Sequence, residues 1–552
     1  MTPVNVAAHL PAMAQQQPDA PALYIPRSAR PRQRDDYRAY SFAELDRQSS
    51  RMAAALRTYG IDRGVRTVLM VPPGFDFFAL TFALFKIGAV PVLVDPGLGL
   101  QNLKGCLHTA EPQAFIGIPK AHLARLLFGW GRPTLRRLVT VGRRCGWGGT
   151  SLAHLLARSG ANTEYPVADT AADEMAAILF TSGSTGAPKG AVYSHGNFAA
   201  QVELLREVYA IRPGEIDLPT FPLFALFAPA LGMTSVVPVM DFTRPALVDP
   251  DNILSAVELF QVTSMFGSPA LINRVGRHGA AHGVHLPSLR RVISAGAPVP
   301  AAVLERFTGM LAPGVELFTP YGATEALPVC SIGSAEILGE TRAATDRGQG
   351  VCIGRPVPGV DLAIIAIDDG PIAHWRPELV QADGKVGEIV VRGPQTTHSY
   401  VNRPEATALA KIIDAETGTF YHRMGDLGYR DNVGRIWFCG RKAHRVETAA
   451  GTLFTICCEA VFNTHPEVFR TALVGVGPPG RQRPVLCVEL EAGVAPAACA
   501  RIGRELLAIG AANPVTTPIE TLLFHPAFPV DIRHNAKIFR EKLALWAAEK
   551  LA

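Results

Sequence analysis

The sequence predicts an α/β protein with a large N-terminal domain, itself composed of subdomains, and a small α+β domain at its C-terminal end. As far as Thr319, short apolar runs alternate with amphipathic helical stretches, as in sheets covered by helices. After Gly350 the pattern changes to short β-rich segments. The chain has 552 residues, of which 48% are hydrophobic and 18% charged, so it has ample material for a core.

The first elements form a helix and then a β-α-β unit. Ser41 and Glu44 have the spacing of a capping box, which predicts an amphipathic helix that ends near Gly60. The unit that follows consists of a strand, a helix and a strand at Arg66–Val71, Phe75–Lys86 and Val90–Val94. Further strands are predicted at Ala114–Ile118, Leu138–Val141, Ala176–Phe180, Thr263–Gly267, Arg291–Ser294 and Glu316–Thr319.

The C-terminal part contains fewer and shorter predicted elements. Strands are expected at Gly387–Arg392, Arg435–Cys439, Arg470–Gly475 and Val485–Leu490, and a helix at Ala536–Leu551. We place the domain boundary near Arg441, which gives an N-terminal domain over 1–440 and a C-terminal lid domain over 441–552.

The segment from Leu218 to Met240 contains no charged residue and is long enough to suggest a membrane helix. It contains four prolines, each of which would remove a backbone donor inside hydrocarbon. We therefore expect buried, irregular chain in a pocket wall and no transmembrane segment.

Charge and cysteine content narrow the class of protein. The net charge is +5, and the basic cluster between Arg27 and Arg38 contains a proline and two aspartates, so a solvated loop is favoured over a nucleic-acid patch. Nine cysteines without a C-x-x-C pair suit a reduced, cytoplasmic protein. No Lys or Arg precedes Arg27, so the basic start of a signal peptide is absent and secretion is not expected.

The strongest local motif directly follows the predicted strand Ala176–Phe180. It reads Thr181-Ser182-Gly183-Ser184-Thr185-Gly186-Ala187-Pro188-Lys189-Gly190. Glycines allow backbone amides to approach an anion, hydroxyls donate hydrogen bonds and the lysine adds positive charge, so the motif suits a polyphosphate. It is not a Walker A loop, because Pro188 and Gly190 flank the lysine. A flexible surface turn is the alternative interpretation of this loop.

A second glycine-rich string, G-x-G-x-x-G at Gly475–Gly480, is interpreted as a turn, because two of its residues are prolines, which lack the backbone N–H groups that would face a dinucleotide.

Together with later motifs, this loop resembles the adenylate-forming superfamily of acyl-CoA synthetases, luciferases and peptide-synthetase adenylation domains. The resemblance covers essentially the whole chain. The further motifs, in order, are Ala295-Gly296-Ala297-Pro298, Thr319-Pro320-Tyr321-Gly322-Ala323-Thr324-Glu325, Gly387–Gly393, Met424-Gly425-Asp426, Gly440-Arg441 and Lys537.

The resemblance implies ATP and Mg²⁺ as cofactors and gives each matched residue a role. Tyr321 would stack on adenine opposite the Ala295–Pro298 turn, and Asp426 would accept hydrogen bonds from the ribose hydroxyls. Thr324 would donate to phosphate, Glu325 would hold Mg²⁺, Arg441 would secure the nucleotide, and Lys537 would bridge the substrate carboxylate and the α-phosphate. In isolation, such carboxylates and lysines are more often ordinary surface groups.

Several positions depart from the acyl-CoA synthetase pattern. Ala225 stands where most members have histidine, Ala443 stands at the hinge position, and Ala536 replaces the glycine before the catalytic lysine. Glu447 replaces the lysine of a Lys-x-x-Gly loop that helps to shape the pantetheine tunnel. The adenylation residues are therefore kept while the features that handle coenzyme A are altered.

A narrower resemblance explains these departures. The strings Phe221–Phe227, Pro229–Gly232, Trp437–Thr448 and Phe528–Ile538 resemble the OleC-type β-lactone synthetases of bacterial long-chain olefin biosynthesis. This resemblance implies a 2-alkyl-3-hydroxyalkanoic acid substrate, which passes through an acyl-AMP to a β-lactone, and association with other olefin-pathway enzymes. The nucleophile would be the substrate's own hydroxyl, already tethered to the acyl group, so no thiol tunnel is needed.

Other roles stay open at this level. The phenylalanines at 221, 224, 227 and 266 are candidates for an apolar pocket wall, although such residues are more often plain core. His422, His444 and His534 lie near matched motifs, but none is assigned as the base for the β-hydroxyl. The alternatives to the lactone synthetase are a long-chain fatty acyl-CoA or acyl-AMP ligase and an inactive nucleotide-binding scaffold.

Overall fold

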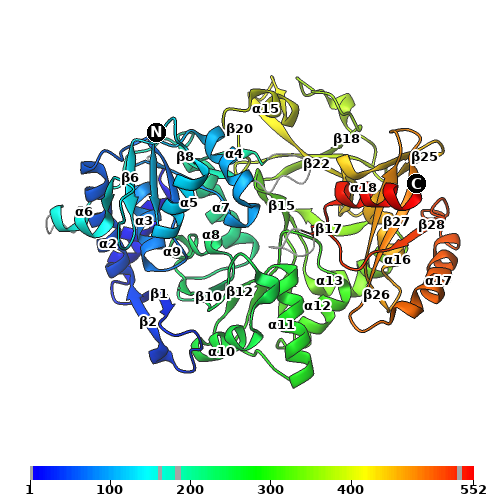
Figure 1. The fold of residues 1–552 in the computed structure, drawn as a ribbon, viewed down its shortest axis with the longest axis horizontal. Helices are drawn as coiled ribbons and strands as arrows, with labels where there is room; N and C mark the ends of the chain where they lie inside the picture. Colours follow the sequence, from blue (N-terminus) through cyan, green and yellow to red (C-terminus); the bar gives the residue numbers. More distant parts are fainter. Residues whose placement is uncertain (1–3, 160–163, 181–187, 531–536) are drawn as a thin grey trace.

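The computed structural model describes residues 4–159, 164–180, 188–530 and 537–552. The described residues form three large sheets, a two-stranded hairpin and a three-stranded sheet. Figure 1 shows the N-terminal elements in blue and cyan on one side, the helices α10 (Pro250–Phe260), α11 (Pro269–His282) and α12 (Ala301–Thr308) below the centre, and the C-terminal elements in orange and red on the opposite side. The predicted α/β class is confirmed.

The first large sheet has eight strands in the order β20-β9-β8-β4-β3-β5-β6-β7. Their bounds are β3 Arg66–Met70, β4 Val90–Leu93, β5 Ala114–Gly117, β6 Arg137–Thr140, β7 Thr150–Ser151, β8 Met175–Phe180, β9 Gly190–Ser194 and β20 Ser399–Tyr400. The helices packed around it are α1 His9–Gln16, α2 Phe42–Thr58, α3 Phe75–Lys86, α4 Leu100–Ala110, α5 Pro119–Phe128, α6 Leu152–Arg158 and α7 His195–Val208. The strands from β8 to β7 are all parallel.

Two features of this sheet are as the sequence predicts. The Oγ atom of Ser41 accepts from the backbone N–H of Glu44 at 3.1 Å, and the Glu44 carboxylate accepts from the Ser41 N–H at 2.8 Å. This capping box satisfies two backbone donors at the start of α2. The helix α3 has the predicted bounds, and the predicted strands agree with the observed ones to within one residue at each end.

The second sheet has seven strands in the order β14-β13-β12-β10-β11-β1-β2. Their bounds are β1 Pro21–Pro26, β2 Tyr37–Ser41, β10 Ile216–Pro219, β11 Thr234–Val236, β12 Ser264–Phe266, β13 Arg291–Ile293 and β14 Glu316–Phe318. The third large sheet is antiparallel and contains β15 Tyr321–Ala323, β16 Ala326–Ser331, β17 Val351–Pro356, β18 Asp361–Ile365, β19 Gly387–Arg392, β21 Lys411–Asp414, β22 Thr419–Arg430 and β23 Ile436–Arg441. The helix α15 (Pro404–Ala410) precedes β21, and the short helices α13 (Ser334–Glu336) and α14 (Arg342–Asp346) follow β16.

The C-terminal part begins with a hairpin of β24 (Val446–Thr448) and β25 (Gly451–Leu453). A three-stranded sheet follows, made of β26 Val468–Val476, β27 Arg483–Leu490 and β28 Thr521–Phe524, with helices α16 Thr455–Phe462, α17 Cys499–Ala511 and α18 Arg540–Leu551. The Gly475–Gly480 string forms the end of β26 and the turn after it, as interpreted. The division between 440 and 441, at the end of β23, stays a prediction.

Two sequence expectations are corrected. The C-terminal helix begins at Arg540 and not at Ala536, because Ile538 is paired with Val530 in a β-bridge. The segment from Leu218 to Met240 is regular rather than irregular: it contains the end of β10, the helices α8 (Pro222–Ala225) and α9 (Ala228–Leu231), and β11. Pro219 ends β10, and Pro222 and Pro229 stand in the first turns of helices, where the missing N–H has no intrahelical partner to lose, while Pro238 lies in irregular chain after β11.

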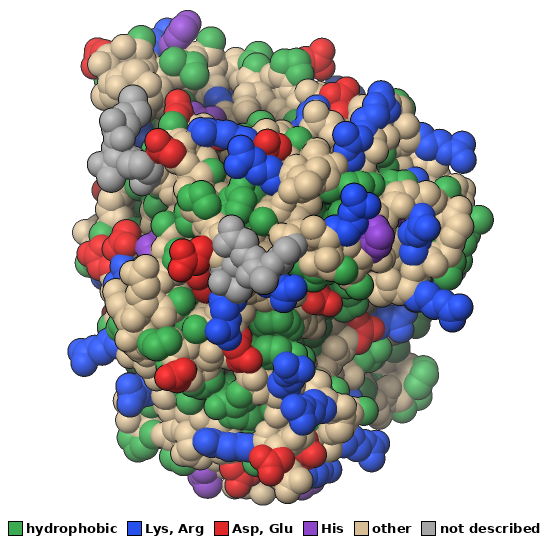
Figure 2. Space-filling view, turned by 90° about the vertical axis from the view of Figure 1, so that its left-hand side faces the viewer, with side chains coloured by type: hydrophobic (Ala, Val, Ile, Leu, Met, Phe, Trp, Pro, Cys, Tyr) green, Lys and Arg blue, Asp and Glu red, His purple; other side chains and the backbone are tan. Residues whose placement is uncertain are grey.

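Among the described residues, no helix has the length and apolar character needed to cross a bilayer. Figure 2 shows one face of the molecule, on which Lys and Arg side chains are interspersed with Asp and Glu rather than gathered into one basic field.

Candidate active site

A cavity of about 1330 Å³ is lined by residues from all three large sheets and from the C-terminal part. Residues expected to bind the nucleotide line it at Lys189, Ala295, Gly296, Gly322 and Arg441. The expected catalytic residues Thr324, Glu325 and Lys537 line it too. Ala297, Pro298, Tyr321 and Asp426 do not belong to the lining, and Thr181, Ser182, Gly183, Ser184, Thr185 and Gly186 lie outside the described residues.

Asp426 lies just behind the cavity wall on β22. It is opposite Arg441 of β23 in the strand register, so the pairing of two neighbouring strands sets these side chains next to each other. The Arg441 Nε lies 3.0 Å from Oδ1 of Asp426, and the Tyr321 hydroxyl donates to Oδ2 at 2.6 Å. Burial raises the pKa of Asp426, and the charge of Arg441 and the bond from Tyr321 oppose this.

The position of Tyr321 depends on a tight hairpin of β15 and β16. A Cβ atom at Gly322 would lie 2.6 Å from the backbone oxygen of Ala326, so this position must stay glycine. The pKa of the Tyr321 hydroxyl is raised well above its usual value, first by burial and then by the charge of Asp426. Tyr321 therefore keeps its hydroxyl proton and donates it in the hydrogen bond to Asp426.

Glu325 lies in the turn of the same hairpin, where Tyr400 of β20 holds it. The Tyr400 hydroxyl donates to Oε1 of Glu325 at 2.5 Å, and the Lys189 ammonium lies 5.1 Å from the centre of the Tyr400 ring. Burial and the negative charge of Glu325 both raise the pKa of Tyr400. Tyr400 thus orients the carboxylate and supports the lysine of the phosphate loop. Sequence reasoning missed this residue, because no local pattern marks a tyrosine that acts on a group 75 positions away.

A buried lysine supports Glu325 from behind. The Lys411 ammonium donates to the backbone oxygen of Thr397, and the Thr397 N–H donates to the backbone oxygen of Glu325 at 2.8 Å. Burial lowers the pKa of Lys411 from 10.5 to about 7, and the charge of Glu325 opposes that shift. Because the pKa of Lys411 differs between the folded and the unfolded chain, the free energy of unfolding depends on pH.

We expect the contribution of Lys411 to stability to rise between pH 7 and pH 10. In this range the unfolded chain keeps the lysine proton, whose usual pKa is 10.5, while the folded protein has lost it, so raising the pH favours the folded state. The difference in unfolding free energy between wild type and Lys411→Met should change by roughly 3 kcal/mol over this range. Urea denaturation of both proteins at several pH values measures it, and parallel pH profiles would contradict the expectation.

The histidines near the matched motifs are poor bases. His422 lines the cavity, its Nδ1 lies 3.2 Å from the Ala410 oxygen, and burial and the charge of Lys411 hold its pKa well below 6.5. Burial and the charges of Arg540, Arg441 and Lys537 lower the pKa of His444 to about 3. His534 lies outside the described residues. Both described imidazoles are therefore weakly basic, and the base for the β-hydroxyl stays unassigned.

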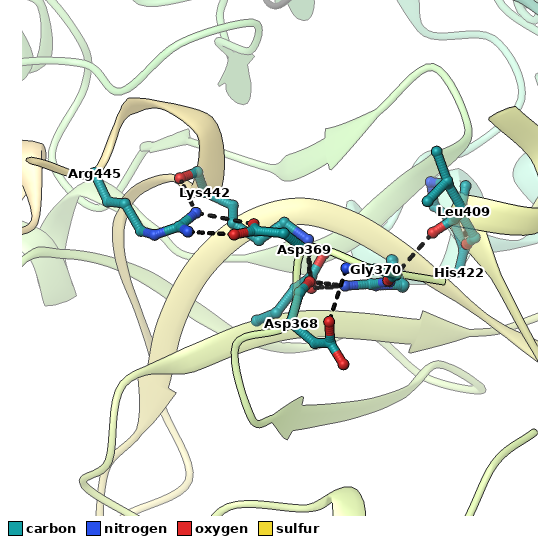
Figure 3. A network of polar contacts seen from close by, with 10 residues as sticks. Asp368, Asp369, Gly370, Leu409, His422, Lys442 and Arg445 are labelled. Atoms are coloured by element: carbon teal, nitrogen blue, oxygen red, sulfur yellow. Dashed lines mark hydrogen bonds and ion pairs between the residues drawn. The ribbon is translucent and has the colours of Figure 1, made fainter. Parts of the chain in front are cut away.

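The chain that follows β23 is tied to a loop of the third sheet, as Figure 3 shows. The Lys442 ammonium donates to the Asp368 oxygen at 2.8 Å and to the Glu388 carboxylate at 3.0 Å. Arg445 donates to Asp369 at 3.1 Å and forms an ion pair with Glu447 at 3.0 Å. Arg445 thus joins Glu447, within the same segment, to Asp369 in a loop of the third sheet.

The family model described as AMP-binding enzyme matches residues 10–401. This chain belongs to the AMP-binding enzyme family. It is 54% identical over 553 residues to an olefin beta-lactone synthetase of Xanthomonas campestris pv. campestris, with 99% of this chain and 98% of the relative covered. It is 53% identical to an olefin beta-lactone synthetase of Stenotrophomonas maltophilia, with 100% and 99% covered.

The chain is also similar to a more distant relative and to two solved structures. A feruloyl-CoA synthase of Amycolatopsis is 30% identical, with 80% of this chain and 81% of the relative covered. The amide bond synthetase McbA of Marinactinospora thermotolerans has a TM-score of 0.78 at 22% identity, and the two chains are covered to 98% and 99%. ATP-bound MatB of Rhodopseudomonas palustris has a TM-score of 0.77 at 21% identity, with both chains fully covered. These structures confirm the expected adenylate-forming fold.

Proposed function

We propose that this protein is an ATP-dependent β-lactone synthetase, an AMP-forming ligase of long-chain olefin biosynthesis. The substrate class is a long-chain 2-alkyl-3-hydroxyalkanoic acid, which is converted through an acyl-AMP to a β-lactone with release of AMP and pyrophosphate. The observation that carries the proposal is the identity of 54% and 53% to relatives of that name over essentially the full chain.

The residues around the cavity suit a nucleotide with a metal ion. Asp426 lies behind the cavity wall, and its buried Oδ1 accepts no hydrogen bond from any described residue, although Arg441 lies in ion-pair distance. An acceptor left over in this way suits the donors that the ribose hydroxyls of a nucleotide would bring to this wall. Ala295 and Gly296 form the facing wall, and Lys189 supplies positive charge for phosphates. The carboxylate of Glu325 is the type of ligand that Mg²⁺ prefers, and bound Mg²⁺ would neutralise charge on the triphosphate.

The reaction then needs two displacements. A carboxylate oxygen of the substrate attacks the α-phosphorus and pyrophosphate leaves, while Lys537 and Thr324 stabilise the charge on the phosphoryl oxygens. The β-hydroxyl of the same molecule next attacks the acyl carbon, gives up its proton, and AMP leaves with the former carboxylate oxygen. The four-membered ring is strained, so the acyl group has to be activated, and the tethered hydroxyl needs only to be held in a reactive conformer.

The rival is a long-chain acyl-CoA or acyl-AMP ligase, which the 30% identity to a feruloyl-CoA synthase favours. The ion pair between Glu447 and Arg445 argues against such a ligase. In the acyl-CoA synthetase pattern this position carries a lysine that helps to shape the pantetheine tunnel, whereas here it is a glutamate paired with Arg445.

The test is proton NMR of purified protein with ATP, Mg²⁺ and a synthetic 2-alkyl-3-hydroxy fatty acid, with and without coenzyme A. We expect ring-proton signals of a β-lactone without coenzyme A. Acyl-CoA formed only when the thiol is present, with no lactone, would place the protein among the ligases. A catalytically inactive scaffold would form no AMP in response to the carboxylic acid.

Location and assembly are further parts of the proposal. All nine cysteines are free thiols, and eight of them are not exposed, which suits a reducing compartment such as the cytoplasm. Association with other enzymes of olefin biosynthesis stays a prediction.

A further inference from the structure

The apolar part of the cavity reaches both faces of the eight-stranded sheet. In a strand, consecutive side chains point to opposite faces. At the carboxyl ends of three strands the cavity is lined by both members of such pairs, namely Leu69 and Met70, Leu93 and Val94, and Leu179 and Phe180. A cavity that touches both members of each pair has to straddle the edge of the sheet.

The two faces carry separate hydrophobic clusters, and both contribute to the lining. On the face covered by α3, the lining includes Phe77, Phe85, Phe198 and Leu226, which belong to or pack against one cluster. On the face covered by α4 and α5 it includes Leu103, Ala121, Ala124 and Trp130 of another cluster. The topology requires this division, because β3-α3-β4 and β4-α4-β5 run in opposite directions across the sheet and right-handed crossovers then place α3 and α4 on opposite faces.

We propose that the cavity forks around the carboxyl edge of this sheet into two apolar arms, and that each arm takes one alkyl chain of the substrate. The arm beside α3 is called the α3 arm, and the arm beside α4 and α5 is called the α5 arm. The inference rests on the proposed function, because a 2-alkyl-3-hydroxy acid carries its two chains on adjacent carbons. The fork lies beside Lys189 and Glu325, so the carboxylate at the branch point can reach the adenylation site while the chains diverge.

The chemistry of the arms favours this occupant. Aromatic and aliphatic side chains make up most of the lining named for both of them, although Asp95 and Lys120 also line the cavity near the α5 arm. Burying alkyl chains against apolar walls is favourable in proportion to the apolar area removed from water. The volume of about 1330 Å³ exceeds the usual range of small-molecule sites, as expected for a cavity that holds a nucleotide and two chains.

The experiment narrows one arm at a time. Ala124→Phe adds a ring in the α5 arm, and Leu226→Trp does so in the α3 arm. Each variant is assayed by lactone NMR and by acid-dependent AMP release with three acids: both chains long, only the 2-alkyl chain short, and only the chain on C3 short. Leu123→Phe is the matched control for Ala124→Phe, because Leu123 lies on α5 next to Ala124, is 52% exposed and does not line the cavity.

We expect each variant to lose at least about tenfold in kcat/KM with the acid that has two long chains. Shortening one chain should restore Ala124→Phe, and shortening the other chain should restore Leu226→Trp, while Leu123→Phe behaves as wild type. If the same shortened acid rescues both variants, or if neither responds to chain length, the fork is wrong. Lactone formation by the wild type would persist in those cases, whereas failure of the proposed function would show as no lactone from any of the three acids.

Discussion

Replacing Lys537 by alanine should lower the rate of acyl-AMP formation by at least about 10²–10³. The chain that follows β23 is held to the third sheet by Lys442 and Arg445, and Lys537 lines the cavity in this orientation. Its ammonium is expected to stabilise negative charge that grows as pyrophosphate leaves, and such groups act more strongly in the transition state than in the ground state. The measurement is pyrophosphate exchange into ATP in the presence of the hydroxy acid.

Lys550→Ala is the control for this prediction, because Lys550 is an exposed lysine in the last turn of α18. It should exchange at the wild-type rate. A Lys537→Ala protein that adenylates at nearly the wild-type rate would reject the role assigned to Lys537. If the first step is lost but lactone still forms from a synthetic acyl-AMP, then Lys537 serves adenylation and is not needed for ring closure.

Glu325→Gln should lower adenylation by about 10² or more and raise the Mg²⁺ concentration that gives half the maximal rate. Glutamine keeps the shape and can still accept the hydrogen bond from Tyr400, so the change isolates the negative charge. An amide is a much weaker ligand for a hard cation than a carboxylate. Initial rates of pyrophosphate exchange as a function of Mg²⁺ measure both effects.

Two further variants separate charge from orientation. Tyr400→Phe keeps the carboxylate but removes its hydrogen bond, so the rate should fall by roughly tenfold to a hundredfold, the effect of losing a hydrogen bond to a charged group. Glu340→Gln removes a carboxylate that is 67% exposed and paired with Arg435, and it should behave as wild type. An unchanged Mg²⁺ dependence in Glu325→Gln would remove Glu325 from the metal site.

Local signals predicted some of the elements. The capping box at Ser41 set the start of α2, because its two residues are only three positions apart. Apolar runs located some strands of the first two sheets, namely β3, β4, β5, β6, β8, β12, β13 and β14. The same reasoning placed the start of α18 too early, since a bridge between Ile538 and Val530 is a long-range pairing that no helix pattern reveals. It also read Leu218–Met240 as irregular, because prolines at element ends look the same in a sequence as prolines that break elements.

By itself, the sequence determined the fold class, the family, and the residue types available for adenylation. Only the tertiary structure decided which of these residues meet. It placed Asp426 behind the wall in contact with Tyr321, and it brought Tyr400 to Glu325 and Lys411 close behind that carboxylate. It also placed residues from both faces of the first sheet in the lining of one cavity. The physical reason is that propensity and periodicity act over one or two turns of chain, whereas these contacts depend on how three sheets pack against one another.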